Sequence, residues 1–169
     1  ASAWRRHWGP EKALASEQAG TDAGWRAGAA IGLRDFTPLA IGLLPWALVT
    51  GIAMRAVGMS ELEAAGMNVI VFAGTAQLGT LPLIASGAPL WLLVLTALAL
   101  NLRFIIFSAS IAPMFGERGR WQKVLASYLL VDAVFALCAR NAFQVRDASW
   151  RWGYYLAPSL LCWLLWQIF

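Results

Sequence analysis

The chain has 169 residues and a mass of 18.4 kDa; 60% of its residues are hydrophobic and only 13% are charged. A soluble domain has about 45–50% apolar and about 25% charged residues, so the composition excludes a soluble globular fold and predicts an integral membrane protein. The net charge of +4 does not indicate a nucleic acid partner, because the basic residues lie between apolar runs, where juxtamembrane positions explain them.

Residues 1–35 are predicted to form a polar N-terminal tail. They hold five basic and four acidic side chains and lack the apolar run of a signal peptide. Within the tail, residues 24–34 suit either a short helix at the lipid headgroups or an extension of the first membrane span. Residues 36–169 are predicted to form a transmembrane helical domain.

Five apolar segments make up this domain. A hydrocarbon core about 30 Å thick is crossed by about 20 helical residues. Unpaired backbone is costly in lipid, and the runs are too long and continuous for barrel strands, so we predict an all-α, polytopic helix bundle. The last segment ends at Phe169 with no basic residue after it, which resembles a helix cut short, so we expect a longer natural protein. The segments lie near residues 36–57, 64–86, 89–115, 122–139 and 152–169.

Basic residues set the expected orientation. They cluster at residues 26–34, 118–123 and 140–151, and the first two clusters fall on opposite sides if every segment crosses fully. An early segment that breaks midway, or that enters and leaves on one side, would remove this conflict. We expect a multi-pass membrane protein with a cytoplasmic N-terminus.

The first two segments contain residues that interrupt helices. Pro45 follows Gly42 in the first segment, and Pro82 follows Gly79 in the second. Proline removes a helix donor and glycine makes unwinding cheap. Paired interruptions of this kind are typical of transporter binding sites, although proline and glycine are also common in ordinary membrane helices. We expect an interruption in at least one of the two segments.

Polar side chains in the middle of apolar segments mark the candidate site. Arg103 and Asp132 would each cost about 2.5–3.5 kcal/mol at the centre of a membrane helix. We therefore expect them to pair, either as a structural ion pair or as part of a substrate or proton site. Gln77 follows a run of small residues, and Asn101 lies two positions before Arg103. Each of these amides suits either a helix–helix hydrogen bond or a ligand contact.

The residues that intramembrane enzymes require are missing from the sequence. His7 is the only histidine, which excludes a metalloprotease motif and a serine–histidine pair within the membrane. Asp132 is the only carboxylate in the middle of an apolar segment, so a two-aspartate site is also excluded. Cys138 and Cys162 lie in apolar runs without metal-ligand spacing and are expected to be buried small hydrophobes. We predict a protein that is not an enzyme and needs no metal or cofactor.

Three motifs resemble those of one transporter family. They are GMSxxE at residues 58–63, FAGxxQ at residues 72–77 and NLR at residues 101–103. Together with Pro45 and a following glycine, their order and spacing resemble the AzlC-type branched-chain amino acid exporters over roughly residues 28–140. The resemblance implies the large subunit of a bacterial inner-membrane exporter for branched-chain and similar hydrophobic amino acids. It also implies a small hydrophobic partner subunit of the AzlD type.

The chain departs from the family pattern in two places near the candidate site. Phe104 follows the NLR motif where the family often has histidine, and Val-Asp-Ala at residues 131–133 stands where the family has Thr-Asp-Glu, so only Asp132 carries over.

These features lead to one hypothesis of function. An amino acid binds near the membrane midplane, opened helix ends near Pro45 and Gly74 hold its carboxylate, and Asp132 neutralises its ammonium or exchanges a proton. Arg103 keeps Asp132 ionised when the site is empty, and the amide side chains fix the orientation of the substrate. Two alternatives stay open, a non-transporting scaffold or assembly subunit and a channel for small solutes. The candidate site residues are Asp132, Arg103, Asn101, Gln77, Gly74 and Pro45.

Overall fold

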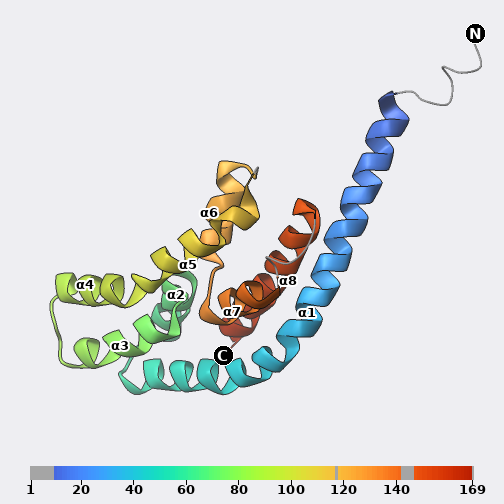
Figure 1. Ribbon diagram of the computed structural model, residues 1–169. Coiled ribbons are helices and arrows are strands. Elements are labelled where there is room, and N and C mark those ends of the chain that lie inside the picture. Colours follow the sequence, from blue (N-terminus) through green and yellow to red (C-terminus); the bar gives the residue numbers. More distant parts are fainter. Residues whose placement is uncertain (1–9, 117, 142–146, 169) are drawn as a thin grey trace, which may run out of the picture.

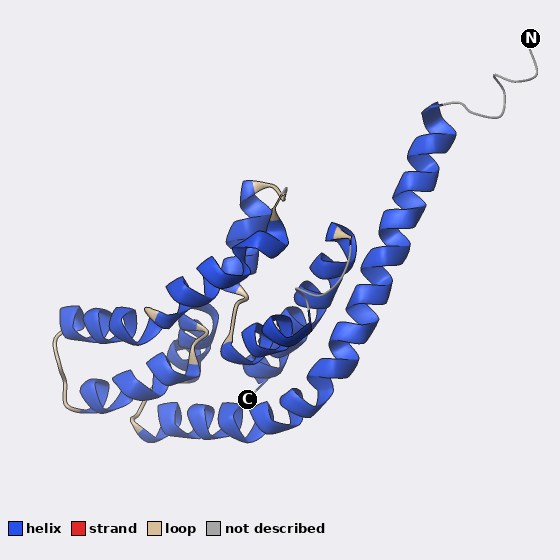
Figure 2. Cartoon of the chain, in the orientation of Figure 1, coloured by secondary structure: helices blue, strands red, loops and turns tan. Residues whose placement is uncertain are grey.

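The computed structural model describes residues 10–116, 118–141 and 147–168, and in this part of the chain it contains helices joined by short loops and no strand (Figure 2). α1 runs the length of the molecule, α8 lies alongside it, and α3 and α4 form a hairpin far from the N-terminus (Figure 1). The elements are α1 (Pro10–Ala56), α2 (Glu61–Val71), α3 (Gly74–Ala85), α4 (Leu90–Asn101), α5 (Arg103–Ile111), the 3₁₀ turn η2 (Ala112–Phe115), α6 (Arg120–Tyr128), α7 (Asp132–Asn141) and α8 (Ala148–Ile168).

Two stretches of the described chain are long and apolar enough to cross a membrane, Asp22–Ala56 within α1 and Leu90–Phe115 through α4, α5 and η2. α6 and α7 make a third candidate if this pair, bent by 115°, counts as one span. The chain is therefore an all-α membrane protein, as its composition predicts.

All five apolar segments are helical, but the second and the fourth are each divided into two helices. The fourth consists of α6 and α7, and the second consists of α2, with 11 residues, and α3, with 12 residues. At 1.5 Å per residue, each is less than about 20 Å long, too short to cross the hydrocarbon core alone.

α1 is one helix from Pro10 to Ala56, although it contains Pro38 and Pro45. It curves along its length (Figure 1). The opened helix end expected near Pro45 is therefore wrong. A single proline removes one donor and bends a helix, but the remaining backbone hydrogen bonds carry the helix past it. Residues 24–34 continue the first span in this structure; their placement at the headgroups stays a prediction.

The middle of α1 packs closely along α8, and the two helices run parallel (Figure 1). A Cβ added to Gly28 would lie 2.1 Å from the carbonyl oxygen of Trp150, and one added to Gly153 would lie 2.2 Å from that of Trp25. Since Cβ atoms do not approach other atoms so closely, only glycine allows this contact. Gly28 and Gly32, four residues apart, form the small-xxx-small pattern of membrane helix pairs. The spacing of these two glycines in the sequence already indicates such a contact.

The core lies where α8 meets α1, α7 and η2. Tyr154 and Tyr155 of α8 are fully buried, and the Phe115 ring of η2 stands edge-on to Tyr155 at a centroid distance of 5.0 Å. Cys138 and Cys162 are buried free thiols, which confirms their prediction as small hydrophobes. This core fixes α7 and α8 relative to α1.

The GMSxxE motif starts α2. Ser60 Oγ accepts a hydrogen bond from the Glu63 backbone N–H (3.3 Å), and Glu63 Oε2 accepts one from the Ser60 N–H (2.7 Å), which makes a capping box. The Ser60 backbone N–H and hydroxyl hold the pKa of the Glu63 carboxyl below its usual range. Gly58 supplies the positive φ of 89° that the preceding turn requires. This motif therefore has a structural role.

Candidate functional site

The break between α2 and α3 places the N-terminus of α3 inside the molecule. Phe72 ends α2 with φ 37° and ψ 44°, a left-handed conformation that is strained for a bulky residue. Its buried ring contacts Tyr128 and Trp166 at centroid distances of 6.0 and 6.5 Å, and this packing holds the strained backbone. Ala73 then precedes α3 with no side-chain cap, so the first-turn N–H groups of α3 keep their hydrogen-bonding capacity.

The predicted interruption of the second segment is confirmed, but its place differs from the expectation. α3 passes through Pro82 unbroken and begins at Gly74. A Cβ on Gly74 would lie 2.7 Å from Trp46 Nε1 and 2.7 Å from Trp166 Cη2. Glycine at this position lets two indole rings close on the start of α3.

Two further helices begin beside this break. α5 starts at Arg103 after a one-residue kink at Leu102, and α7 starts at Asp132 after the bend that separates it from α6. A carboxylate on the first residue of a helix is stabilised by the positive end of the helix dipole. The Asp132 carboxylate therefore lies at the positive end of α7.

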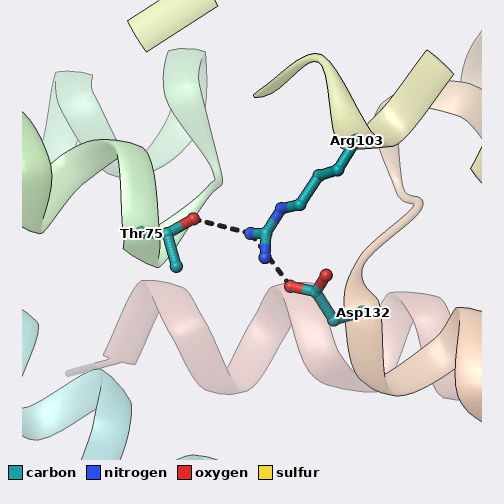
Figure 3. Close-up of polar contacts among 3 residues, drawn as sticks. All are labelled: Thr75, Arg103 and Asp132. Carbon is teal, nitrogen blue, oxygen red and sulfur yellow. Dashed lines mark hydrogen bonds and ion pairs between the residues drawn. The ribbon is translucent and has the colours of Figure 1, made fainter. Parts of the chain in front are cut away.

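The Arg103 guanidinium joins these helix starts (Figure 3). It donates to Thr75 Oγ1 at 2.6 Å and pairs with Asp132 Oδ2 at 3.0 Å. The pairing predicted from the sequence is therefore confirmed. The Arg103 side chain is 32% exposed and that of Asp132 is 51% exposed, so a solute can reach both. Phe104 lies beneath the guanidinium, with its ring centroid 5.0 Å from Arg103 Cζ.

Sequence reasoning missed Thr75. The signal was available, because a hydroxyl in the first turn after an interrupted helix is well placed to meet a partner. Its hydroxyl gives Arg103 a neutral acceptor in addition to Asp132.

Thr75, Arg103 and Asp132 face a cavity of about 380 Å³. This volume lies in the range of about 300–1,000 Å³ that is usual for small-molecule sites. Its polar groups gather at the ion pair, and most of the remaining wall is apolar. The lining residues are Leu39, Gly42, Leu43, Trp46, Phe72, Ala73, Gly74, Thr75, Arg103, Phe104, Val131, Asp132, Ala133, Cys162 and Trp166.

Of the six predicted residues, Gly74, Arg103 and Asp132 line this cavity. Pro45 lies inside α1 and is not part of the wall. Asn101 lies at the end of α4, outside the wall, and its Oδ1 has no hydrogen-bond partner in the described part of the chain.

Gln77 lies behind the cavity in a buried hydrogen-bond network. It is fully buried; its Nε2 donates to Asn68 Oδ1 at 2.7 Å, and its Oε1 accepts from Trp166 Nε1 at 3.1 Å. Because Trp166 lines the cavity, Gln77 fixes part of the wall without facing the space itself. This is the helix–helix alternative that the sequence left open.

No group of three or more histidine, cysteine or acidic side chains that could hold a metal is found among residues 10–116, 118–141 and 147–168.

Comparison with known proteins identifies related sequences. The family described as "AzlC protein" matches residues 38–169. The "Inner membrane protein YgaZ" of Escherichia coli (strain K12) is 28% identical over 137 residues, 80% of this chain and 55% of that protein. An "Uncharacterized membrane protein" of Archaeoglobus fulgidus is 30% identical over 109 residues, 64% of this chain and 48% of that protein. The chain spans about half the length of these relatives. No solved structure matches it.

Proposed function

The chain belongs to the AzlC family, and on that premise we propose that it is part of a secondary transporter that exports branched-chain or similar hydrophobic amino acids across the bacterial inner membrane. The family and the membrane protein relatives support a transporter-like role in a membrane. The observation that carries the proposal is the Arg103–Asp132 ion pair on the wall of an otherwise mainly apolar cavity.

The chemistry of the cavity suits an α-amino acid. Arg103, Thr75 and the start of α3 offer donors to a carboxylate, and Asp132 offers an acceptor to an ammonium group. Leu39 and Leu43 belong to the apolar wall, which accepts an aliphatic side chain. A solute with an aliphatic side chain, and with an ammonium and a carboxylate group attached to one carbon, fits this division of the wall.

Substrate binding would exchange one set of ion pairs for another. In the empty site Arg103 and Asp132 neutralise each other, which avoids two unpaired charges next to lipid. A zwitterion that inserts between them pairs its carboxylate with Arg103 and its ammonium with Asp132, so no charge is left uncompensated. Asp132 is also the group that carries the proton in our proposal if export is coupled to proton movement.

The proposal includes a partner and an orientation. By resemblance to the family, a small hydrophobic subunit of the AzlD type completes the transporter. The N-terminus lies in the cytoplasm, and Asn101 and Gln77 support the site from outside its wall.

Flux of leucine tests the proposal. Proteoliposomes that contain the chain with a small partner subunit are loaded with unlabelled leucine, and the uptake of radiolabelled leucine by exchange is measured. We expect saturable exchange that Asp132→Asn abolishes at equal membrane expression. No flux in the unaltered protein would indicate a scaffold, and flux that rises linearly with leucine would indicate a channel. Either result would contradict the proposal.

A further inference from the structure

A second cavity lies one step further along the groove between α1 and α7. It has a volume of about 370 Å³, and Arg34 of α1 and Arg140 of α7 both line it. Leu39 lines this cavity and also the cavity that holds Arg103 and Asp132, so the two spaces share a wall. Along α7, Asp132 borders the first cavity and Leu137 the second.

The polar groups of this second cavity leave it with positive charge. Neither Arg34 nor Arg140 has a hydrogen bond or ion pair with any residue in the described ranges, and both side chains are exposed. Asp35 adds one carboxylate to the wall, and its Oδ2 accepts a hydrogen bond from the Tyr154 hydroxyl at 2.9 Å. With two guanidinium groups and one carboxylate, these lining residues carry a net positive charge and attract anionic groups. The charges of the Arg103–Asp132 pair, in contrast, cancel.

The remaining wall of this cavity is apolar, with Pro38, Leu39 and Leu137 among its residues. Arg140 lies eight positions after Asp132, which corresponds to a rise of about 12 Å along α7. An aliphatic amino acid can therefore keep its side chain against apolar wall while its carboxylate passes from the outer guanidinium groups toward Arg103.

We propose that the groove at Arg34 and Arg140 is a second binding site for the amino acid, occupied on the way to or from the Arg103–Asp132 cavity. This inference rests on the proposed function. The carboxylate of the amino acid binds between the two guanidinium groups, and Asp35 attracts its ammonium. Asp35 favours a ligand that carries an ammonium beside its anionic group, because an anion without one would be repelled by the neighbouring carboxylate.

Two measurements test the site. Equilibrium dialysis with radiolabelled leucine counts the molecules bound per chain in the detergent-purified protein, and exchange in proteoliposomes gives the KM. The unaltered chain is compared with Arg34→Gln/Arg140→Gln and with Asp132→Asn. Arg26→Gln is the control, because Arg26 is an exposed arginine of the same helix that does not line the groove.

We expect two leucines per unaltered chain and one in the Arg34→Gln/Arg140→Gln variant, whose KM rises about tenfold at low salt with little change in maximal rate. In 0.5 M salt the difference in KM shrinks, because exposed charges are screened. Asp132→Asn retains the outer leucine, and Arg26→Gln behaves as the unaltered chain.

Three results would overturn the inference. Transport with unchanged stoichiometry and KM in the double variant would remove the outer site and leave the proposed function standing. The groove would be a lipid site instead if phosphatidylglycerol in phosphatidylcholine vesicles activates exchange by the unaltered chain but not by the double variant, while the number of leucines bound is unchanged. Absence of leucine binding and exchange in the unaltered protein would overturn the proposed function together with this inference.

Discussion

The Arg103 guanidinium lies 3.0 Å from the Asp132 carboxylate, and each of these residues is the first residue of a helix. The two helix starts come from segments that the sequence places almost thirty residues apart. Where the two helices meet, Arg103 and Asp132 pair and form the polar part of the cavity wall. The consequences of this pairing can be measured separately from transport.

Removal of one member of the pair should cost more stability than removal of both. We expect Asp132→Asn or Arg103→Gln alone to lower the free energy of unfolding by about 1–3 kcal/mol, because each leaves a charge within an apolar segment without its partner. The double variant should recover part of this loss. Thermal unfolding in detergent, followed by tryptophan fluorescence, measures the three variants. Additive losses would show that the pair contributes no coupling energy.

The contact between α1 and α8 should depend on glycine. Gly28→Ala places a Cβ about where the Trp150 carbonyl oxygen lies, and overpacking of this kind usually costs about 1–3 kcal/mol. Gly42→Ala is the matched control on the same helix, because nothing lies within 4 Å of its added Cβ. Thermal unfolding should separate the two variants. Equal stability would mean that α1 and α8 do not pack this closely.

The start of α3 should tolerate no side chain at residue 74. Gly74→Ala forces Trp46 or Trp166 to move into the cavity, since both rings would lie 2.7 Å from the new Cβ. We expect about a tenfold weaker leucine affinity, measured by equilibrium dialysis. Gly66→Ala on α2 is the control, because its added Cβ meets open space. Unaltered affinity in Gly74→Ala would place the solute elsewhere.

Gln77 should act through hydrogen bonds and not through ligand contact. Gln77→Leu leaves Asn68 Oδ1 and Trp166 Nε1 without this partner, which should cost about 1–3 kcal/mol of stability. In a double-mutant cycle with Asn68→Leu, the combined loss should be smaller than the sum of the single losses. If Gln77→Leu keeps full stability but does not bind leucine, Gln77 contacts the ligand directly and this prediction is wrong.

Much of the fold and part of the site could be predicted from the sequence. The apolar segments gave the helices, and the cost of burying Arg103 and Asp132 predicted their pairing. Glycine and proline predicted an interruption but not its place, because the strained turn at Phe72 depends on packing against Trp166, 94 positions later. Pro45 was misread for the same reason, since whether a proline bends or ends a helix depends on the surrounding structure.

Ligand discrimination tests the central claim most directly. Leucine, 4-methylpentanoate (which lacks the ammonium) and 3-methylbutylamine (which lacks the carboxylate) share one aliphatic chain, and equilibrium dialysis gives the affinity of each for the unaltered chain and for Asp132→Asn. We predict that the unaltered chain prefers leucine over both analogues by about tenfold or more, because each analogue leaves one member of the Arg103–Asp132 pair unmatched. When the outer site is removed by Arg34→Gln/Arg140→Gln, we predict that Asp132→Asn takes this advantage over 4-methylpentanoate away from leucine. An Asp132→Asn variant that still prefers leucine to the same degree in that background would contradict the account.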